Sequence, residues 1–276
     1  MGSNTSKSKY SSDDRVVQNL KDEMSVKLLK CCEFYDCEYE IVYYCLRNGA
    51  DPNIRNTKEY TPLLYAIKQQ KIAVVEILLQ YKANPNVYCY DDGPALIKAI
   101  ELGNPAIVEL LLRYGANPNI LSQMNKNTPL MIASKYSNTG DNTESINLLL
   151  KYGAYPNVQN VEGNTALTLA CRYSNTTSNN QVVRMLLENG TNPNIMNNYG
   201  TLPILISITN VGTDSNIETV RLLLEYGADP YAQNIDGKNA FVIATEKHQY
   251  DVIKMLNDII SPLPSAPPLA LLDNRS

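Results

Sequence analysis

The sequence predicts an all-α solenoid of about seven helix-pair units that are joined by short hairpin fingers. One motif, typified by GADPN, recurs six times, with its proline at Pro52, Pro85, Pro118, Pro156, Pro193 and Pro230. The intervals between these prolines are 33, 33, 38, 37 and 37 residues, a period typical of stacked repeat proteins. Glycine follows the second helical segment in five of the six units, where a left-handed helix cap is expected. These glycines are Gly49, Gly115, Gly153, Gly190 and Gly227.

Residues 1–15 are expected to form a disordered tail with a lipidation signal. Gly2 and Ser6 satisfy the N-myristoylation pattern, in which the initiator methionine is removed and the amine of Gly2 is acylated. The stretch resembles the N-termini of Src-type tyrosine kinases, and Lys7 and Lys9 add attraction to an anionic membrane. One myristoyl chain gives only reversible binding, so we expect a weak, switchable anchor. The alternative is a tail in which Gly2 stays unmodified.

The repeat array is expected over residues 16–260, and it begins with an N-terminal cap repeat at 16–56. This first unit keeps the second helix and its terminal glycine but lacks the helix-starting pattern of the later units. The departure fits a capping repeat, which needs a different outer face.

Five internal repeats are expected over residues 57–235, and the clearest of them opens at Thr61. Thr61 is a good N-cap, and Pro62 suits the first helical position because an N–H there would have no partner. Lys82 stands where the other units have glycine, so Lys82→Gly is expected to raise stability. Helical spacing predicts a buried set of apolar residues in this unit. They are Leu63, Ala66, Ile67, Val74, Val75, Ile77, Leu78 and Leu79.

Three polar segments lengthen the later units, and each falls between the two helices of its unit. They span 135–145, 172–181 and 209–218, and their Ser, Asn, Thr and Gly content predicts loops. One interpretation is that they are insertions tolerated at exposed turns. The other is that equivalent loops form a second contact surface.

A C-terminal cap repeat is expected at 236–260, followed by a proline-rich flexible tail at 261–276. Such a tail favours an extended conformation that suits recognition in a groove. Four of its residues resemble the short late-domain motif that recruits the membrane-budding machinery, so a contact with that machinery is expected. These residues are Pro264, Ser265, Ala266 and Pro267.

The openings of the helical units resemble the ankyrin repeat. TPLLYA (61–66), TPLMIA (128–133) and TALTLA (165–170) match the TPLHxA opening of that family, and the resemblance covers about residues 25–260. It implies a hairpin finger followed by two antiparallel helices in each unit, with a partner protein bound by the concave side and the fingertips. The histidine of the family opening is absent from every unit. In the family it helps to tie neighbouring fingers by hydrogen bonds, so packing is expected to replace those bonds here.

The fingertips are the expected partner-binding surface. Several of their side chains are aromatic or methionine, types that are enriched in interface cores. For each of them the alternative is packing against the neighbouring finger. The candidates are Lys58, Tyr60, Tyr90, Asp91, Met124, Lys126, Glu162, Tyr199, Ile235 and Asp236.

Composition and motifs argue against several other classes of function. The formal charge of −4 argues against general nucleic-acid binding, which needs a basic face. We find no nucleophile with a base, no phosphate-cradling glycine loop and no metal cluster. We therefore expect no enzyme activity, small-molecule substrate, metal or cofactor. The only histidine, His248, is expected to have a structural or solvent role, and the six cysteines are expected to be reduced packing residues.

The sequence thus predicts a non-catalytic adaptor that binds a protein partner and is loosely tethered to the cytoplasmic face of a membrane. Repeats of the LLLKYGAYPN type resemble the ankyrin arrays of giant and other large DNA viruses, which favours a viral protein acting in a eukaryotic host cell. Two alternatives remain for the role: delivery of a target to a ubiquitin ligase, and a structural, virion-associated function.

Overall fold

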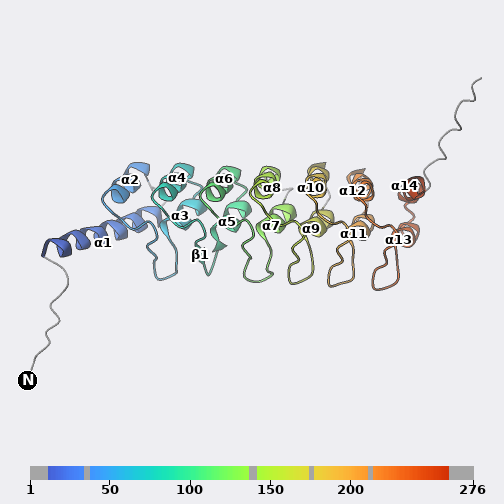
Figure 1. Cartoon of the computed structure of the whole chain (residues 1–276), viewed down its shortest axis with the longest axis horizontal. Coiled ribbons are helices and arrows are strands. Elements are labelled where there is room, and N and C mark those ends of the chain that lie inside the picture. Colours follow the sequence, from blue (N-terminus) through green and yellow to red (C-terminus); the bar gives the residue numbers. More distant parts are fainter. Residues whose placement is uncertain (1–11, 34–37, 137–141, 174–176, 211–213, 261–276) are drawn as a thin grey trace, which may run out of the picture. The chain divides into compact units, whose positions relative to one another are not determined.

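The computed structural model describes residues 12–33, 38–136, 142–173, 177–210 and 214–260. The chain divides into two compact units, each of which contains several of the helix-pair repeats. Unit 1 ends at Val161 and unit 2 begins at Glu162. Within the described residues the helices follow one another in seven pairs (Figure 1). This arrangement confirms the predicted class of helical repeat solenoid.

Every first helix after α1 has seven residues, whereas α1 itself has 22. Unit 1 contains α1 (Ser12–Glu33), α2 (Tyr39–Arg47), α3 (Pro62–Lys68), α4 (Ile72–Gln80), β1 (Tyr88–Cys89), β2 (Gly93–Pro94), α5 (Ala95–Glu101), α6 (Pro105–Arg113), α7 (Pro129–Lys135) and α8 (Asn142–Lys151). Unit 2 contains α9 (Ala166–Arg172), α10 (Thr177–Glu188), α11 (Pro203–Thr209), α12 (Asp214–Glu225), α13 (Ala240–Glu246) and α14 (Tyr250–Ile260).

Each unit has two layers of helices with its core between them. In unit 1, α3 packs against α5 and α5 against α7, while α4 packs against α6 and α6 against α8. In unit 2, α9, α11 and α13 form one layer and α10, α12 and α14 the other. The hairpin fingers project from the layer of first helices (Figure 1). All eight apolar residues predicted to be interior in the first internal repeat, from Leu63 to Leu79, are buried.

The helices of the repeats have the N-caps and glycine C-caps that the sequence predicts. The Thr61 hydroxyl accepts a hydrogen bond from the N–H of Leu64 at 3.3 Å, which confirms Thr61 as an N-cap. The five glycines that follow the second helices have φ angles of 80 to 90°. Lys82 occupies the same place with a φ of 68°, so a side chain stands where the backbone conformation favours glycine.

Three boundaries differ from the expected loops. α8 begins at Asn142, α10 at Thr177 and α12 at Asp214, so a part of each segment predicted to be a loop is helical. Ser, Thr, Asn and Asp are common in turns but are also the residues that most often start helices. The remaining loop residues, 137–141, 174–176 and 211–213, lie outside the described residues.

The N-terminal helix also begins earlier than expected. α1 starts at Ser12, whereas a disordered tail was expected as far as residue 15. The lipidation signal at Gly2 and the motif at 264–267 lie outside the described residues. Among the helices that are described, none combines the length and the apolar character needed to cross a membrane.

Candidate protein-binding surface

Three fingers are closed by an asparagine side chain that caps its own turn, and the finger of Met124 is closed by the Ser122 hydroxyl, which accepts a hydrogen bond from the N–H of Asn127 at 2.9 Å. Asn56 Oδ1 accepts hydrogen bonds from the N–H groups of Lys58 and Tyr60 at 2.9 and 3.0 Å. Asn197 and Asn234 make the same pair of bonds in two fingers of unit 2, at 2.9 to 3.1 Å. An asparagine that binds the backbone two residues later stabilises a tight turn. The two or three residues inside this turn are therefore pushed outward as the fingertip.

Eight of the ten predicted fingertip residues are exposed. They are Lys58, Tyr90, Asp91, Met124, Lys126, Tyr199, Ile235 and Asp236. The apolar side chains among them are unusually accessible, with 88% of Met124 and 76% of Ile235 exposed. Glu162 is half-buried, and its side chain accepts a hydrogen bond from Asn164 at 2.8 Å.

Tyr60 was wrongly predicted to be an exposed fingertip residue, because only 5% of it is accessible. Its ring stacks on Tyr65 with 5.0 Å between the centroids, and its hydroxyl donates a hydrogen bond to the carboxylate of Asp92. Asp92 belongs to the next finger, 32 residues away. Spacing along the chain could not reveal this partner, so the sequence could not distinguish an inward tyrosine from an outward one.

Asp92 is the centre of a charged cluster that joins two fingers to two helices. The ammonium groups of Lys68 on α3 and Lys98 on α5 each lie 2.9 Å from its carboxylate. Burial raises the pKa of Asp92, but hydrogen bonds from Lys68, Tyr60 and Lys98 outweigh burial and hold that pKa well below its ordinary value. Burial and the bond to Asp92 raise the pKa of Tyr60 well above its ordinary value. The cluster therefore holds an ionised carboxylate and a neutral phenol, which is a structural tie between fingers.

One asparagine from each of four motifs joins consecutive repeats. Asn53 donates to the carbonyl of Lys82 at 3.1 Å and accepts from the N–H of Asn84 at 2.7 Å. The same two bonds recur at Asn86 and Asn119 in unit 1 and at Asn194 in unit 2, at 2.7 to 3.1 Å. We call Asn53, Asn86, Asn119 and Asn194 the asparagine ladder.

Further asparagines tie adjacent fingers together. In unit 1 the Asn160 amide donates to Asn127 at 2.7 Å, and in unit 2 the Asn197 amide donates to Asn164 at 2.9 Å. All four side chains are buried. The expectation that packing alone replaces the missing family histidine was therefore wrong, because asparagine side chains form hydrogen bonds between fingers at other positions.

Leu121 and Met196 were missed by the sequence analysis, although both are exposed apolar residues on fingers. Each lies three residues after the motif proline, at Pro118 and Pro193. Aligning the motifs by their prolines and asking which columns hold apolar residues outside the core pattern would have found them. They extend the apolar part of the finger surface in both units.

No group of three or more histidine, cysteine, aspartate or glutamate side chains that could hold a metal ion occurs among the described residues. Burial raises the pKa of the Cys171 thiol to about 12, so this group is protonated and unreactive at neutral pH. His248 is exposed in the turn between α13 and α14, with a φ of 55°.

Comparison with known proteins places these features in a family. The family model described as "Ankyrin repeats (3 copies)" matches residues 28–122, 112–197, 130–234 and 176–261. No match was found among curated proteins.

Solved ankyrin structures share the fold. An ankyrin repeat domain from Acinetobacter baumannii AYE is 25% identical, with a TM-score of 0.66 over 72% of this chain and 97% of that domain. The ankyrin repeat domain of Bcl-3, a member of the IkappaB protein family, is 20% identical, with a TM-score of 0.69 over 86% of this chain and 98% of that domain. The ankyrin repeat protein EF0377 is 22% identical, with a TM-score of 0.64 over 74% of this chain and 98% of that one.

Proposed function

Because this chain belongs to the ankyrin repeat family, whose arrays generally serve as scaffolds for protein–protein interaction, we propose that it is a non-catalytic adaptor that binds a protein partner on its finger surface. The observation that carries the proposal is the set of large apolar side chains held outward by hydrogen-bonded fingers. The most exposed of them are Tyr90 and Met124 in unit 1 and Tyr199 and Ile235 in unit 2. Exposed apolar groups of this kind, with several on the fingers of each unit, are typical of interaction sites.

The fingers are well suited to hold these anchors in place. Asparagine side chains close three of their turns and Ser122 closes the turn of Met124, and the asparagine ladder and the Asp92 cluster join the bases of the fingers. A side chain on a rigid support loses less conformational freedom on binding, so more of its contact energy appears as affinity. The finger surface thus combines apolar anchors with preorganisation.

The test is to compare partner binding by single fingertip variants. Met124→Arg and Tyr199→Arg should each abolish or strongly weaken capture of the partners that the wild-type protein retains, because a charge replaces an apolar anchor. Tyr250→Arg is the matched control, since the exposure of Tyr250, 74%, lies between those of Met124 and Tyr199, and Tyr250 stands at the start of α14 and not on a finger. Circular dichroism would verify that all three variants fold. If both fingertip variants retain every partner, the binding surface lies elsewhere.

We further propose that a myristoyl chain on Gly2 holds the adaptor loosely at the cytoplasmic face of a membrane in a eukaryotic host cell, where a viral ankyrin protein would act. The N-terminal sequence pattern supports this proposal. Metabolic labelling with a myristate analogue should mark the wild-type protein and not Gly2→Ala. Identical membrane fractionation of the two proteins would remove the proposal of a lipid anchor, without affecting the finger surface.

The tail motif is proposed as a second, independent contact. Pro264, Ser265, Ala266 and Pro267 fit recognition of an extended peptide by the budding machinery. Replacing Pro264 and Pro267 by alanine should remove that contact and leave fingertip partners bound. Retention of the budding machinery by this variant would show that the motif is not used.

A further inference from the structure

The N-terminal helix continues past the body of unit 1. Its first buried residues are Met24 and Ser25, and Ser25 anchors it because the Ser25 hydroxyl accepts from the N–H of Asp51 at 2.8 Å. Residues 16–23 are all exposed. In Figure 1 this part of α1 extends beyond α2 and α3.

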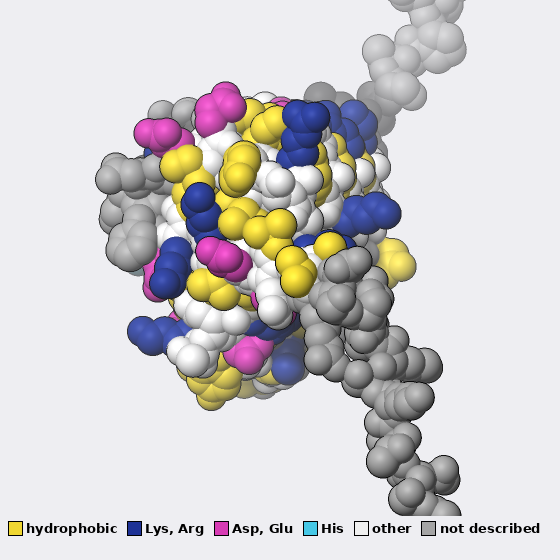
Figure 2. Space-filling model, turned by 90° about the vertical axis from the view of Figure 1, so that its left-hand side faces the viewer, with side chains coloured by type: hydrophobic (Ala, Val, Ile, Leu, Met, Phe, Trp, Pro, Cys, Tyr) yellow, Lys and Arg dark blue, Asp and Glu magenta, His cyan; other side chains and the backbone are white. Residues whose placement is uncertain are grey.

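The end repeat exposes apolar side chains where a polar outer face is the rule. Terminal repeats usually present a polar outer face, because no further repeat covers them. On α1 and α2, seven large apolar side chains are exposed, and 68% of Val16 is accessible. The seven are Val16, Val17, Leu20, Val26, Tyr39, Ile41 and Tyr44. Figure 2 shows hydrophobic side chains gathered among charged ones on this end of unit 1.

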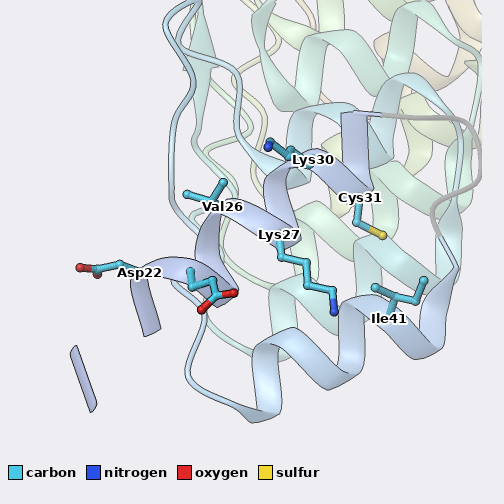
Figure 3. Close-up of a pocket in the computed structure, with 7 residues that line it drawn as sticks. Asp22, Val26, Lys27, Lys30, Cys31 and Ile41 are labelled. Atoms are coloured by element: carbon cyan, nitrogen blue, oxygen red, sulfur yellow. The ribbon is translucent and has the colours of Figure 1, made fainter. Parts of the chain in front are cut away.

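A shallow groove of about 790 Å³ runs along α1 beside Ile41 of α2 (Figure 3). Asp22, Val26 and Lys30 follow one another at intervals of four residues on its wall. Residues four apart lie on the same side of a helix, so this side presents a negative, an apolar and a positive group in order. Lys27 adds a second cation, and its ammonium lies over the ring of Tyr44 at 5.5 Å.

We propose that a second copy of this chain docks on this face, with α1 of one copy antiparallel to α1 of the other. An antiparallel pair that is centred on Val26 places Asp22 of each copy opposite Lys30 of the other, because both lie four residues from the centre. The two-fold axis thus turns one negative and one positive group into two complementary contacts, and the Val26 side chains of the two copies meet between them. Among the described residues, neither Asp22 nor Lys30 forms an ion pair within its own chain.

Charge favours a protein copy over a membrane as the occupant. The exposed charged residues of α1 from Lys21 to Glu33 are balanced, because Lys21, Lys27 and Lys30 are matched by Asp22, Glu23 and Glu33. Helices that lie on anionic membranes have polar faces rich in lysine and arginine, without such a balance. The alternation of sign suits a self-complementary protein contact.

The experiment measures the self-association of the full-length, unacylated protein by analytical ultracentrifugation over a concentration series. The wild type should form a dimer. Asp22→Lys and Lys30→Asp should each weaken the dimer by about tenfold or more, because two attractive contacts become repulsive. An equimolar mixture of the two variants should associate again, because the two cations of one variant then face the two anions of the other. The double variant Asp22→Lys/Lys30→Asp should also dimerise.

Asp258→Lys is the matched control, because Asp258 is an exposed aspartate on α14 and its replacement should leave the dimer unchanged. A wild type that stays monomeric throughout the series would overturn the proposal, as would a dimer that is insensitive to both single charge reversals. A monomer that sediments with phosphatidylserine vesicles and loses this property in Lys30→Asp would show that the face contacts membranes instead.

Discussion

At the scale of single residues, Lys82 is where the backbone conformation and the side chain conflict most clearly. Its φ of 68° lies in the left-handed region, which costs a residue with a Cβ roughly 1–2 kcal/mol. Its side chain is exposed, so removing it loses little packing. The carbonyl of Lys82 accepts the bond from Asn53, and a glycine would keep that carbonyl.

Lys82→Gly is therefore expected to stabilise the protein by about 1 kcal/mol, because relief of strain outweighs the greater flexibility of the unfolded chain. Urea denaturation followed by circular dichroism would measure the difference. Gly115→Ala, at the equivalent place in the next repeat with a φ of 90°, should be destabilising by a similar amount. A lower urea midpoint for Lys82→Gly would contradict this account.

Asp92 should make stability depend on pH in the acid range. Its pKa is lower in the folded protein than in the unfolded chain, so unfolding takes up a proton at acid pH. The contribution is complete above the unfolded pKa of about 4 and is lost as the pH falls through the folded pKa. The difference in unfolding free energy between wild type and Asp92→Asn should thus be largest near neutral pH and shrink below about pH 4. A difference that is independent of pH would show that the cluster contributes no charge interaction.

Tyr60 shows where residue-level prediction fails. The sequence placed it correctly on a finger, but its partner is 32 residues away on another finger. Lys82, by contrast, could be predicted because the reason for glycine is local and is visible in five parallel copies. The glycine cap repeats with the motif, whereas no other repeat has tyrosine and aspartate at the places of Tyr60 and Asp92, so their contact has no parallel copy in the sequence.

At the scale of elements, the repeated motif combines two different asparagine functions. The first residue of the D/N-P-N segment caps its own turn, as when Asn84 accepts from the N–H of Asn86 at 2.9 Å. The last residue reaches the next repeat as part of the asparagine ladder. The period and the turn could be predicted from the sequence, but the bond to the next repeat could not. An asparagine that caps its own turn and one that bonds to the next repeat are the same residue type.

Replacing one asparagine of the ladder should weaken the contact between consecutive repeats. Asn86→Ala loses a bond to the carbonyl of Gly115 and a bond from the N–H of Asn117, and should cost about 1 kcal/mol at this exposed site. Asn125→Ala is a suitable control, because Asn125 is also exposed and among the described residues its side chain forms no hydrogen bond. Equal urea midpoints for the two variants would show that the ladder adds nothing to stability.

At the scale of the whole molecule, the sequence predicted the class of fold and the family well because both rest on periodicity. The helical extension of α1 and its apolar outer face were not predicted, because the first unit departs from the repeat and offers no second copy for comparison. Fingertip exposure was predicted for most positions, because the repeat fixes where each finger lies.

The proposed dimer and the proposed lipid anchor together predict a measurable avidity. One myristoyl chain binds a bilayer only weakly, whereas two chains joined in one particle bind with the advantage of a high effective concentration. On uncharged phosphatidylcholine vesicles, where the added lysine gains no attraction, Asp22→Lys should therefore lower the vesicle affinity of the myristoylated protein by about tenfold or more. Acylation of Gly2, measured by mass spectrometry, should be unchanged. Equal vesicle binding by acylated wild type and Asp22→Lys would separate the anchor from the dimer.

The asparagine ladder also bears on how such a chain can change in length. A repeat with a ladder asparagine provides an amide for its successor and offers a glycine or lysine carbonyl to its predecessor. If such a repeat were duplicated in the gene, each copy would find its ladder hydrogen-bond partners in the repeats on both sides. Tyr231 stands at the ladder position of the last motif and has no carboxamide to offer. A repeat inserted before Tyr231 therefore keeps every ladder hydrogen bond. A repeat added after Tyr231 would lack the ladder bonds to its predecessor unless that tyrosine were replaced by asparagine.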